Sequence, residues 1–192
     1  MTKQLQIADL KDSLRRASEE FSAFVAGPYV KPDEPTHAAN SASPGATIRL
    51  RVIKELTSKD FSVYLGEDNR LRDGGEKNYG QANNAVVFER HYIINHVDAV
   101  ILFPCSVGSF CEFGDWAPDE EICKKTLIFI EEKYKEKQNY FCEGPTKFAD
   151  SNGAKIYYIN YDDLENIVGK SIDFLNLLQS KKRIRVLYGR DR

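Results

Sequence analysis

The sequence predicts an α/β protein with a doubly wound, five-stranded parallel sheet and helices on both faces. Five short apolar segments, rich in β-branched and aromatic residues, are separated by longer segments, most of which show the spacing of an amphipathic helix. Strands that alternate with helices in this way form parallel sheets, because each helix carries the chain back to the same starting edge. The size agrees, since 192 residues with 42% hydrophobic and 29% charged side chains suit one globular domain with a sizeable core.

The predicted strands are the most apolar stretches of the chain. The third, DAVILFP, has almost no polar residue, so we expect it to be buried on both faces of the sheet. Gly27-Pro28 closes the first strand and Gly66-Glu67-Asp68 closes the second. The five segments are 21–30, 61–65, 98–104, 126–130 and 155–161.

Helices are predicted where apolar residues recur every three or four positions. Ser43-Pro44 marks a helix start, because Ser accepts free N–H groups and Pro fits the first helical position. In the helix at 84–95 we expect Val87, Tyr92 or His91, and Ile94 to face inward. The predicted helices cover about 7–21, 43–56, 84–95 and 162–179.

Three segments show neither the apolar character of a strand nor the three- to four-residue spacing of a helix. Residues 31–47 collect Pro, Ser, Ala and Gly and are predicted to be a loop, as far as the helix start within them. Residues 68–83 contain three glycines and many polar side chains, which predicts a long exposed loop that could cover a binding site. Residues 131–152 are expected to be irregular.

Charge is distributed unevenly. The chain has 27 basic and 29 acidic residues, for a net charge of −2, but residues 180–192 carry six basic residues and one acidic residue. We therefore divide the chain into one α/β domain, residues 1–180, and a basic C-terminal tail, residues 181–192. The tail is either a solvated end or a contact for nucleic acid or an acidic regulatory protein.

Composition also bears on compartment. No apolar run approaches the roughly 18 residues that span a bilayer, and the N-terminus lacks the apolar core of a signal peptide, so no membrane association is expected. The four cysteines form no C-x-x-C pair and the three histidines make no zinc pattern with them. We expect reduced thiols, no metal and a cytoplasmic protein; the disulfide-scaffold, collagen-like and disordered classes are excluded.

In a doubly wound sheet of the Rossmann or flavodoxin-like kind, a ligand binds beyond the carboxyl ends of the strands, where the strand order reverses. This rule places Gly27, Pro28 and Tyr29 at the site, after the first strand, and Glu67 after the second. Gly27 permits close approach of a ligand, or is an ordinary turn residue. Glu67 is suited to bind ribose hydroxyls, or is an exposed loop acid.

The segment after the third strand is the richest in candidate residues. Ser106, Gly108 and Ser109 form a small-residue turn into a helix, whose free N–H groups suit a phosphate or a developing oxyanion. Glu112 lies one turn later and is expected to point into the crevice. The alternative, that Glu112 merely complements the helix N-terminus, fits its aromatic neighbours less well.

A second candidate carboxylate is Glu89, in the first half of the helix that leads into the third strand. There it would bind sugar hydroxyls or transfer a proton, or else lie on a solvated helix face. Asp98 starts the third strand, roughly 20 Å from its carboxyl end at about 3.3 Å per residue, so we expect a structural role. His91 and His96 are likewise expected to be structural.

The segment AVILFPCSVGSFCEFGDWA resembles the strand–loop–helix of nucleoside 2-deoxyribosyltransferase-like proteins, and is most similar to the N-glycosidase effectors of bacterial retron antiphage systems. The pattern Phe-Pro-x-Ser-x-Gly-Ser-Phe-x-Glu-x-Gly, from Phe103 to Gly114, is the specific part, and the resemblance covers most of residues 21–160. The turn is also similar, less closely, to that of lysine-decarboxylase-like phosphoribohydrolases.

The resemblance implies cleavage of the N-glycosidic bond of a nucleotide, with Glu112 matching the catalytic glutamate nucleophile. In the retron effectors the substrate is NAD+, so NAD+ would be a substrate rather than a cofactor, with nicotinamide and ADP-ribose as products. The nicotinamide ring of NAD+ is already cationic and leaves as a neutral molecule, so its departure needs no strong general acid. The resemblance implies that the protein acts as a toxin in antiphage defence. We expect it to form a homo-oligomer.

Two other functions stay open. One is a deoxyribosyltransferase or hydrolase of nucleosides or deoxynucleotides, although Cys105-Ser106 replaces the Asp that deoxyribosyltransferases often carry there. The other is a nucleotide-binding sensor without turnover. Retron effectors usually continue into a longer helical, DNA-contacting region that residues 1–192 do not include. The sequence is therefore compatible with a retron effector and with a minimal toxin that is regulated by a partner or by oligomerisation.

Overall fold

The computed structural model describes residues 10–15, 21–31 and 43–188, and over these residues it confirms the predicted doubly wound α/β fold. All strand pairs are parallel, and the strand order is β2-β1-β3-β4-β5. The strands are β1 Ser22–Ala26, β2 Ser62–Tyr64, β3 Ala99–Leu102, β4 Thr126–Glu131 and β5 Lys155–Ile159. The order reverses between β1 and β3, so the ligand site of this topology is expected beyond their carboxyl ends.

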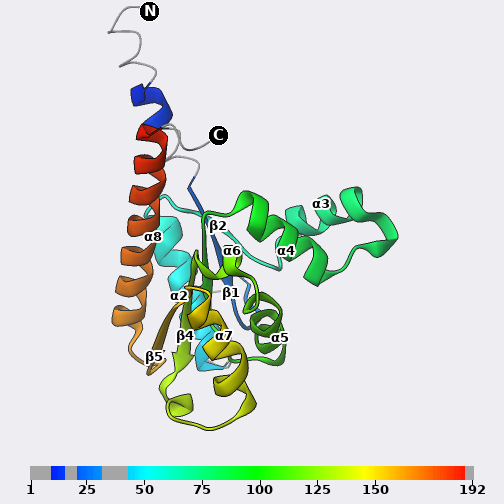
Figure 1. The fold of residues 1–192 in the computed structure, drawn as a ribbon, viewed down its shortest axis with the longest axis vertical. Coiled ribbons are helices and arrows are strands. Elements are labelled where there is room, and N and C mark those ends of the chain that lie inside the picture. Colours follow the sequence, from blue (N-terminus) through cyan, green and yellow to red (C-terminus); the bar gives the residue numbers. More distant parts are fainter. Residues whose placement is uncertain (1–9, 16–20, 32–42, 189–192) are drawn as a thin grey trace, which may run out of the picture.

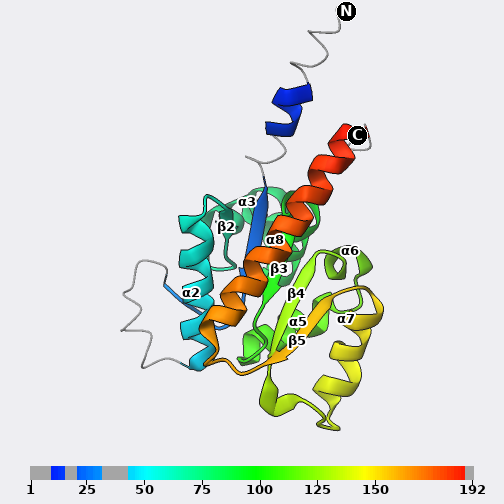
Figure 2. The same cartoon turned by 90° about the vertical axis from the view of Figure 1, so that its left-hand side faces the viewer.

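The helices lie on both faces of the sheet. Helices α2 and α8 cover one face, and α3 to α7 lie on the other (Figures 1 and 2). The α-helices are α2 Pro44–Ser58, α3 Asn69–Tyr79, α4 Ala85–His96, α5 Val107–Trp116, α6 Glu120–Cys123, α7 Lys147–Ser151 and α8 Leu164–Leu187. Short 3-10 turns occupy η2 Gly80–Ala82 and η3 Glu132–Tyr134, and η4 Cys142–Thr146 is a π-helix.

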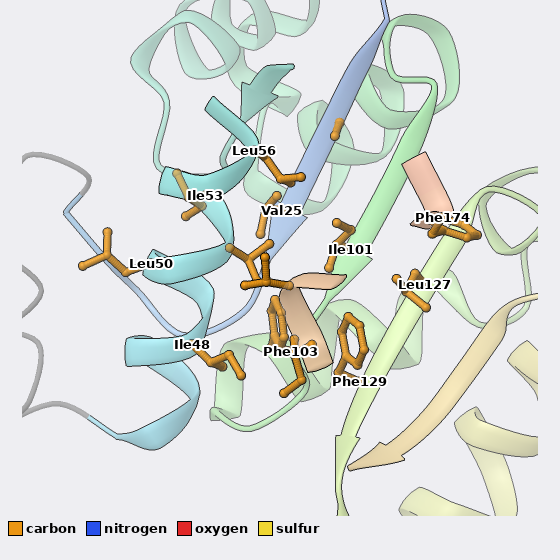
Figure 3. Close-up of a cluster of buried hydrophobic side chains, with 14 of the residues drawn as sticks. Val25, Ile48, Leu50, Ile53, Leu56, Ile101, Phe103, Leu127, Phe129 and Phe174 are labelled. Carbon is orange, nitrogen blue, oxygen red and sulfur yellow. The ribbon is translucent and has the colours of Figure 1, made fainter. Parts of the chain in front are cut away.

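Alternate residues of the strands supply two cores, one on each face of the sheet. Val25, Ile101 and Phe129 point toward α2 and α8, where they pack with Leu56 and Phe174 (Figure 3). On the other face the intervening strand residues pack against α4, α5 and α6; the buried members include Phe24, Val100, Leu102, Ile128, Phe88, Ile93, Phe113, Trp116 and Ile122. Burial on both faces explains why the third strand is apolar throughout.

Two predicted loops are partly helical. Residues 69–79 form α3 although the segment was expected to be a loop, because α3 packs on α4: a Cβ on Gly75 would lie 2.6 Å from Phe88 Cβ. Tertiary packing, not an apolar pattern, therefore supports this helix. The segment 131–152, expected to be irregular, contains η3, η4 and α7.

The helix boundaries and one helix face also differ from expectation. The predicted end of the last helix at Gln179 is wrong, because α8 continues to Leu187 and carries residues 181–187 of the basic segment. In α4 the buried residues are Phe88, Glu89 and Ile93, one position away from the predicted inward face. The predicted helix over 7–21 is helical at 10–15; its remaining residues up to 20, and most of the 31–47 loop, lie outside the described residues.

The C-terminal half of α8 extends past the sheet (Figures 1 and 2) and is tied to it at the amino edge. Lys182 Nζ forms an ion pair with Asp98, at 2.9 Å from Oδ1, and Asp98 Oδ2 also accepts the Ser22 backbone N–H at 2.9 Å. Asp98 thus holds β1, β3 and α8 together at the edge far from the carboxyl ends. Within the described ranges, every helix is too short or too polar to cross a membrane.

Candidate active site

A cleft of about 440 Å³ opens where the strand order reverses, beyond the carboxyl ends of β1 and β3. It is lined by the segments that follow β1, β2 and β3, together with α2, α4 and the start of α5. The lining residues are Phe24, Ala26, Gly27, Tyr29, Arg49, Gly66, Glu67, Glu89, Ser106, Val107, Gly108, Ser109 and Glu112.

The cleft brings together the candidate residues selected from the sequence, with one exception. Pro28 is buried and does not line the cleft; its carbonyl oxygen instead accepts a hydrogen bond from Arg49. Tyr29 is 67% exposed at the cleft, in the turn after β1. Segments far apart in the sequence therefore converge on one site, as the topological rule requires.

The N-terminus of α5 forms one wall of the cleft. Ser106 is the N-cap, and its Oγ accepts the Ser109 N–H at 3.2 Å, while Ser109 Oγ accepts the N–H groups of Ser106 at 2.9 Å and Cys105 at 3.0 Å. These reciprocal bonds fix the turn and leave the exposed Val107 and Gly108 at the helix start. The partial positive charge of a helix N-terminus favours an anionic ligand at this wall.

Glu112 stands one turn along the same helix. Its Oε2 atom is buried and has no hydrogen-bond partner among the described residues. Burial raises the pKa of this carboxyl from 4.5 to about 7; the charge of Arg49 opposes the rise, and the charge of Glu67 adds to it. A buried carboxylate with an uncommitted oxygen and a pKa near neutrality has the properties of a nucleophile or proton carrier.

Glu89 belongs to the same cleft and not to a solvated helix face. It lies on α4 and is 8% exposed. Its Oε1 atom lies against Gly66, where a Cβ would come within 2.5 Å. The absence of a side chain at residue 66 thus makes room for the Glu89 carboxylate between α4 and the end of β2.

Arg90, the residue after Glu89, links the two helices that carry the carboxylates. Its guanidinium donates to the Asp115 carbonyl oxygen at 3.1 Å and to Asp115 Oδ2 at 3.3 Å on α5. It also donates to Asp119 Oδ2 at 2.5 Å, at the start of α6. The relative position of Glu89 and Glu112 is therefore fixed outside the cleft by charge-assisted hydrogen bonds.

Arg49 is the site residue that sequence reasoning missed. It is 1% exposed on α2, and its guanidinium makes a two-point ion pair with Glu67, with Nη1–Oε1 at 2.6 Å and Nη2–Oε2 at 2.8 Å. A signal existed, since residue 49 lies three or four positions from Gly45, Val52 and Ile53 and so falls on the buried stripe of α2. A charge on a buried stripe requires a partner.

The remaining reactive side chains near the cleft are unsuited to catalysis. Burial raises the pKa of the Cys105 thiol to about 12, which keeps it protonated and unreactive at neutral pH. Cys111 is exposed beside Glu112 but does not line the cleft. Over the described residues, no group of three or more His, Cys, Asp or Glu side chains is placed to hold a metal ion.

Comparison with known proteins places the chain in a defined family. The family described as STM3845 retron effector protein matches residues 45–187, which is well over half of the chain. The chain therefore belongs to this family of retron effectors. The match spans α2 to α8 and so includes Arg49, Glu67, Glu89 and Glu112.

The chain also resembles a protein from Escherichia coli. The chain is 26% identical over 106 residues to an Escherichia coli protein described as "Retron Ec86 putative ribosyltransferase/DNA-binding protein". The aligned residues make up 55% of this chain and 34% of that protein, so the chain spans about a third of the length of that relative. Both comparisons favour a retron effector over a minimal toxin.

Proposed function

We propose that this retron effector is an N-glycosidase that hydrolyses NAD+ to nicotinamide and ADP-ribose, and that it acts as a toxin in antiphage defence. The observation that carries the proposal is the Glu112 carboxyl: buried, uncommitted at Oε2, and placed one turn from a helix N-terminus in the cleft at the strand-order reversal. Such a pairing puts a carboxylate beside a site suited to a phosphorylated sugar.

The proposed reaction runs in two steps on Glu112. The ionised carboxylate attacks C1′ of the nicotinamide ribose; the C1′–N bond breaks, and its electron pair neutralises the nicotinamide ring nitrogen. Water then attacks C1′, the Glu112–C1′ bond breaks, and the carboxylate is regenerated with ADP-ribose as product. The water loses its proton in this step, and Glu89 is the carboxylate we assign to receive it or to hold the ribose hydroxyls.

The other lining residues fit the rest of the substrate. The α5 N-terminus, with Ser106, Gly108 and Ser109, suits the diphosphate. Glu67 lies where an acidic residue binds ribose hydroxyls in dinucleotide folds, and the exposed ring of Tyr29 is available to a base. Carboxylates on three sides of the cleft favour the cationic nicotinamide ring over an anionic base.

The name of the Escherichia coli relative supports glycosyl-transfer chemistry, since it contains the word ribosyltransferase. That name leaves the acceptor undefined. Hydrolysis is our proposal because Cys105 and Ser106 supply no additional carboxylate in the turn, and because water reaches a cleft that is open at Val107 and Tyr29.

The decisive experiment measures nicotinamide release from NAD+ by the purified protein and by Glu112→Gln and Glu112→Ala. We expect release by the wild type and a loss of at least about a thousandfold in both variants. Glu120→Gln is the matched control, because Glu120 is exposed on α6 and away from the cleft, and it should retain wild-type activity.

The same assay with deoxynucleosides and deoxynucleotides separates the alternatives. Base release from these substrates alone, dependent on Glu112, would identify a deoxyribosyltransferase or deoxynucleotide hydrolase. Tight nucleotide binding without turnover, unchanged in Glu112→Gln, would identify a sensor domain. Either result contradicts the proposed NAD+ hydrolysis.

We further propose that the projecting half of α8 contacts a nucleic acid. Lys181, Arg183 and Arg185 are exposed there, whereas Lys182 is engaged by Asp98. The name of the Escherichia coli relative includes the term DNA-binding, which favours DNA over an acidic regulatory protein. The contact is tested by measuring the binding of single-stranded DNA. We expect binding that weakens steeply with added salt and that is lost in the double variant Lys181→Glu/Arg185→Glu. The expected homo-oligomer is tested by sedimentation of the same sample.

A further inference from the structure

We propose that Arg49 is the positioning residue for the chemistry of Glu112: it holds the turn after β1 and the Glu67 carboxylate in place, and it presents a fixed positive charge to the cleft. This inference rests on the proposed N-glycosidase function and assigns a role to a residue of the same site.

Every donor of Arg49 is already committed. Nε and Nη2 donate to the Val25 carbonyl oxygen at 3.1 and 2.8 Å, and Nη2 also donates to Glu67 Oε2 at 2.8 Å. Nη1 lies 2.6 Å from both the Pro28 carbonyl oxygen and Glu67 Oε1, and 3.3 Å from the Gly27 carbonyl oxygen. A guanidinium has five N–H groups, and six contacts use all of them. Arg49 therefore has no free donor for a substrate phosphate and acts through the groups it holds.

The first of these groups is the turn after β1. Three of the four carbonyl oxygens from Val25 to Pro28, those of Val25, Gly27 and Pro28, accept hydrogen bonds from the guanidinium. The chain wraps so closely that a Cβ on Gly27, whose φ is +152°, would lie 3.1 Å from Arg49 Cδ. The path of this turn, which carries Tyr29 to the cleft, is thus set by Arg49.

The second group is Glu67, whose two carboxylate oxygens both pair with Arg49. This two-point geometry fixes the plane of the carboxylate as well as its position. An ammonium group would supply the charge but not the planar fork. We therefore expect Lys at this position to preserve the charge of the site and to lose its alignment.

The charge itself acts on Glu112. The charged groups lining the cleft are Arg49 on α2, Glu67 after β2, Glu89 on α4 and Glu112 on α5. Burial drives the pKa of Glu112 upward; the charge of Arg49 is the largest opposing influence, and that of Glu67 acts in the other direction. Arg49 thus keeps a buried carboxyl ionisable near neutral pH, and Glu67 moderates it.

The effect of the Arg49 charge is tested by an NMR titration of the Glu112 carboxyl. The signal of this carboxyl is assigned because it is missing from the spectrum of Glu112→Gln. We expect the pKa of Glu112 to rise by about one pH unit in Arg49→Met, to fall in Glu67→Gln, and to stay within a few tenths of a unit of the wild type in Arg49→Lys. An unmoved pKa in folded Arg49→Met overturns the charge role of Arg49, and an unmoved pKa in Glu67→Gln overturns that of Glu67. If Arg49→Met does not fold, the neutral and polar Arg49→Gln takes its place.

The alignment is tested by steady-state kinetics on NAD+. In Arg49→Lys we expect kcat/KM to fall at least about tenfold at an unchanged Glu112 pKa, because the turn and Glu67 are no longer held. Arg51→Lys is the matched control, since Arg51 lies on the exposed face of α2. Wild-type kinetics in Arg49→Lys overturns the positioning role.

The two proposals fail in different ways. The titration needs no substrate, so expected shifts in a protein that leaves NAD+ intact would sustain the charge role of Arg49 and contradict the NAD+ hydrolysis. NAD+ cleavage that depends on Glu112, with an unchanged Glu112 pKa in the variants and wild-type kinetics in Arg49→Lys, would sustain the NAD+ hydrolysis and contradict the role of Arg49.

Discussion

The carboxylate of Glu89 occupies the space that a side chain on residue 66 would need, since a Cβ there would lie 2.5 Å from Glu89 Oε1. Gly66 lies in the segment between β2 and α3, and Glu89 belongs to α4, so this contact joins two walls of the cleft. The position of the second site carboxylate therefore depends on a glycine that carries no chemistry of its own.

Gly66→Ala should displace Glu89 and lower activity without unfolding the protein. The atom in the way is the end of a flexible side chain, so the free energy of unfolding should change by less than about 1 kcal/mol. Nicotinamide release should fall at least about tenfold, which is at the low end of the rate losses expected when a proton-transfer or positioning group is misplaced.

Gly74→Ala is the control for that substitution. Residue 74 lies in α3 with open space around it, so an added methyl group contacts nothing within 4 Å. Activity should be unchanged, and the helix should gain about 0.5–1 kcal/mol in stability. Full activity in Gly66→Ala, with Glu89 shown to have moved, would remove Glu89 from the reaction.

The activity should depend on pH through Glu112. Its pKa of about 7 in the free protein means that kcat/KM for NAD+ rises about tenfold per pH unit below pH 7 and levels off above it. In the complex, the cationic nicotinamide ring favours the ionised carboxylate, so the corresponding limb of kcat should lie at lower pH. A kcat/KM that is flat between about pH 5 and 8 would contradict the assignment of Glu112 as nucleophile.

The same carboxyl should destabilise the fold as pH rises. Below pH 4.5, Glu112 is protonated in both the folded and unfolded protein; between 4.5 and about 7 only the folded protein keeps the proton. The free energy of unfolding contributed by this group therefore falls over that window. Glu112→Gln should be more stable than the wild type above pH 7, by up to about 3 kcal/mol, and the difference should vanish near pH 4.5.

Urea unfolding at several pH values measures this difference. Glu120→Gln again provides the control, because an exposed glutamate should leave the pH dependence parallel to that of the wild type. A constant gap between Glu112→Gln and the wild type across the range would show that the carboxyl is not perturbed by burial.

The sequence was sufficient for the fold class and for most of the cleft because both follow from strand ends. Once five strands are placed, topology alone brings Gly27, Glu67 and the turn before Glu112 to one edge. Glu89 was found by the same geometry, from its position at the start of a helix that runs antiparallel to β3.

What the sequence did not reveal depends on contacts without a sequence pattern. Apart from the Glu67 carboxylate, the acceptors that hold Arg49 are backbone carbonyls at Val25, Gly27 and Pro28, a group that every residue carries and no residue type marks. Helix α3 forms because Gly75 packs on α4, not because of an apolar stripe. The last turns of α8 are exposed and strongly charged, so no burial pattern marked their continuation to Leu187.

Asp98 and Glu89 give opposite expectations, although Glu89 is a buried carboxylate on α4 and Asp98 is a partly buried one just before β3. Asp98 accepts hydrogen bonds from Ser22 and Lys182 at the amino edge of the sheet, far from the cleft. Asp98→Asn should cost about 1–2 kcal/mol of stability, measured by urea unfolding, and leave turnover per folded molecule unchanged. Glu89→Ala should lower turnover at least about tenfold at an equal folded fraction. The folded fraction of both variants is measured by circular dichroism. A larger loss of turnover in Asp98→Asn than in Glu89→Ala would place the chemistry at the amino edge of the sheet and overturn the assignment of the cleft.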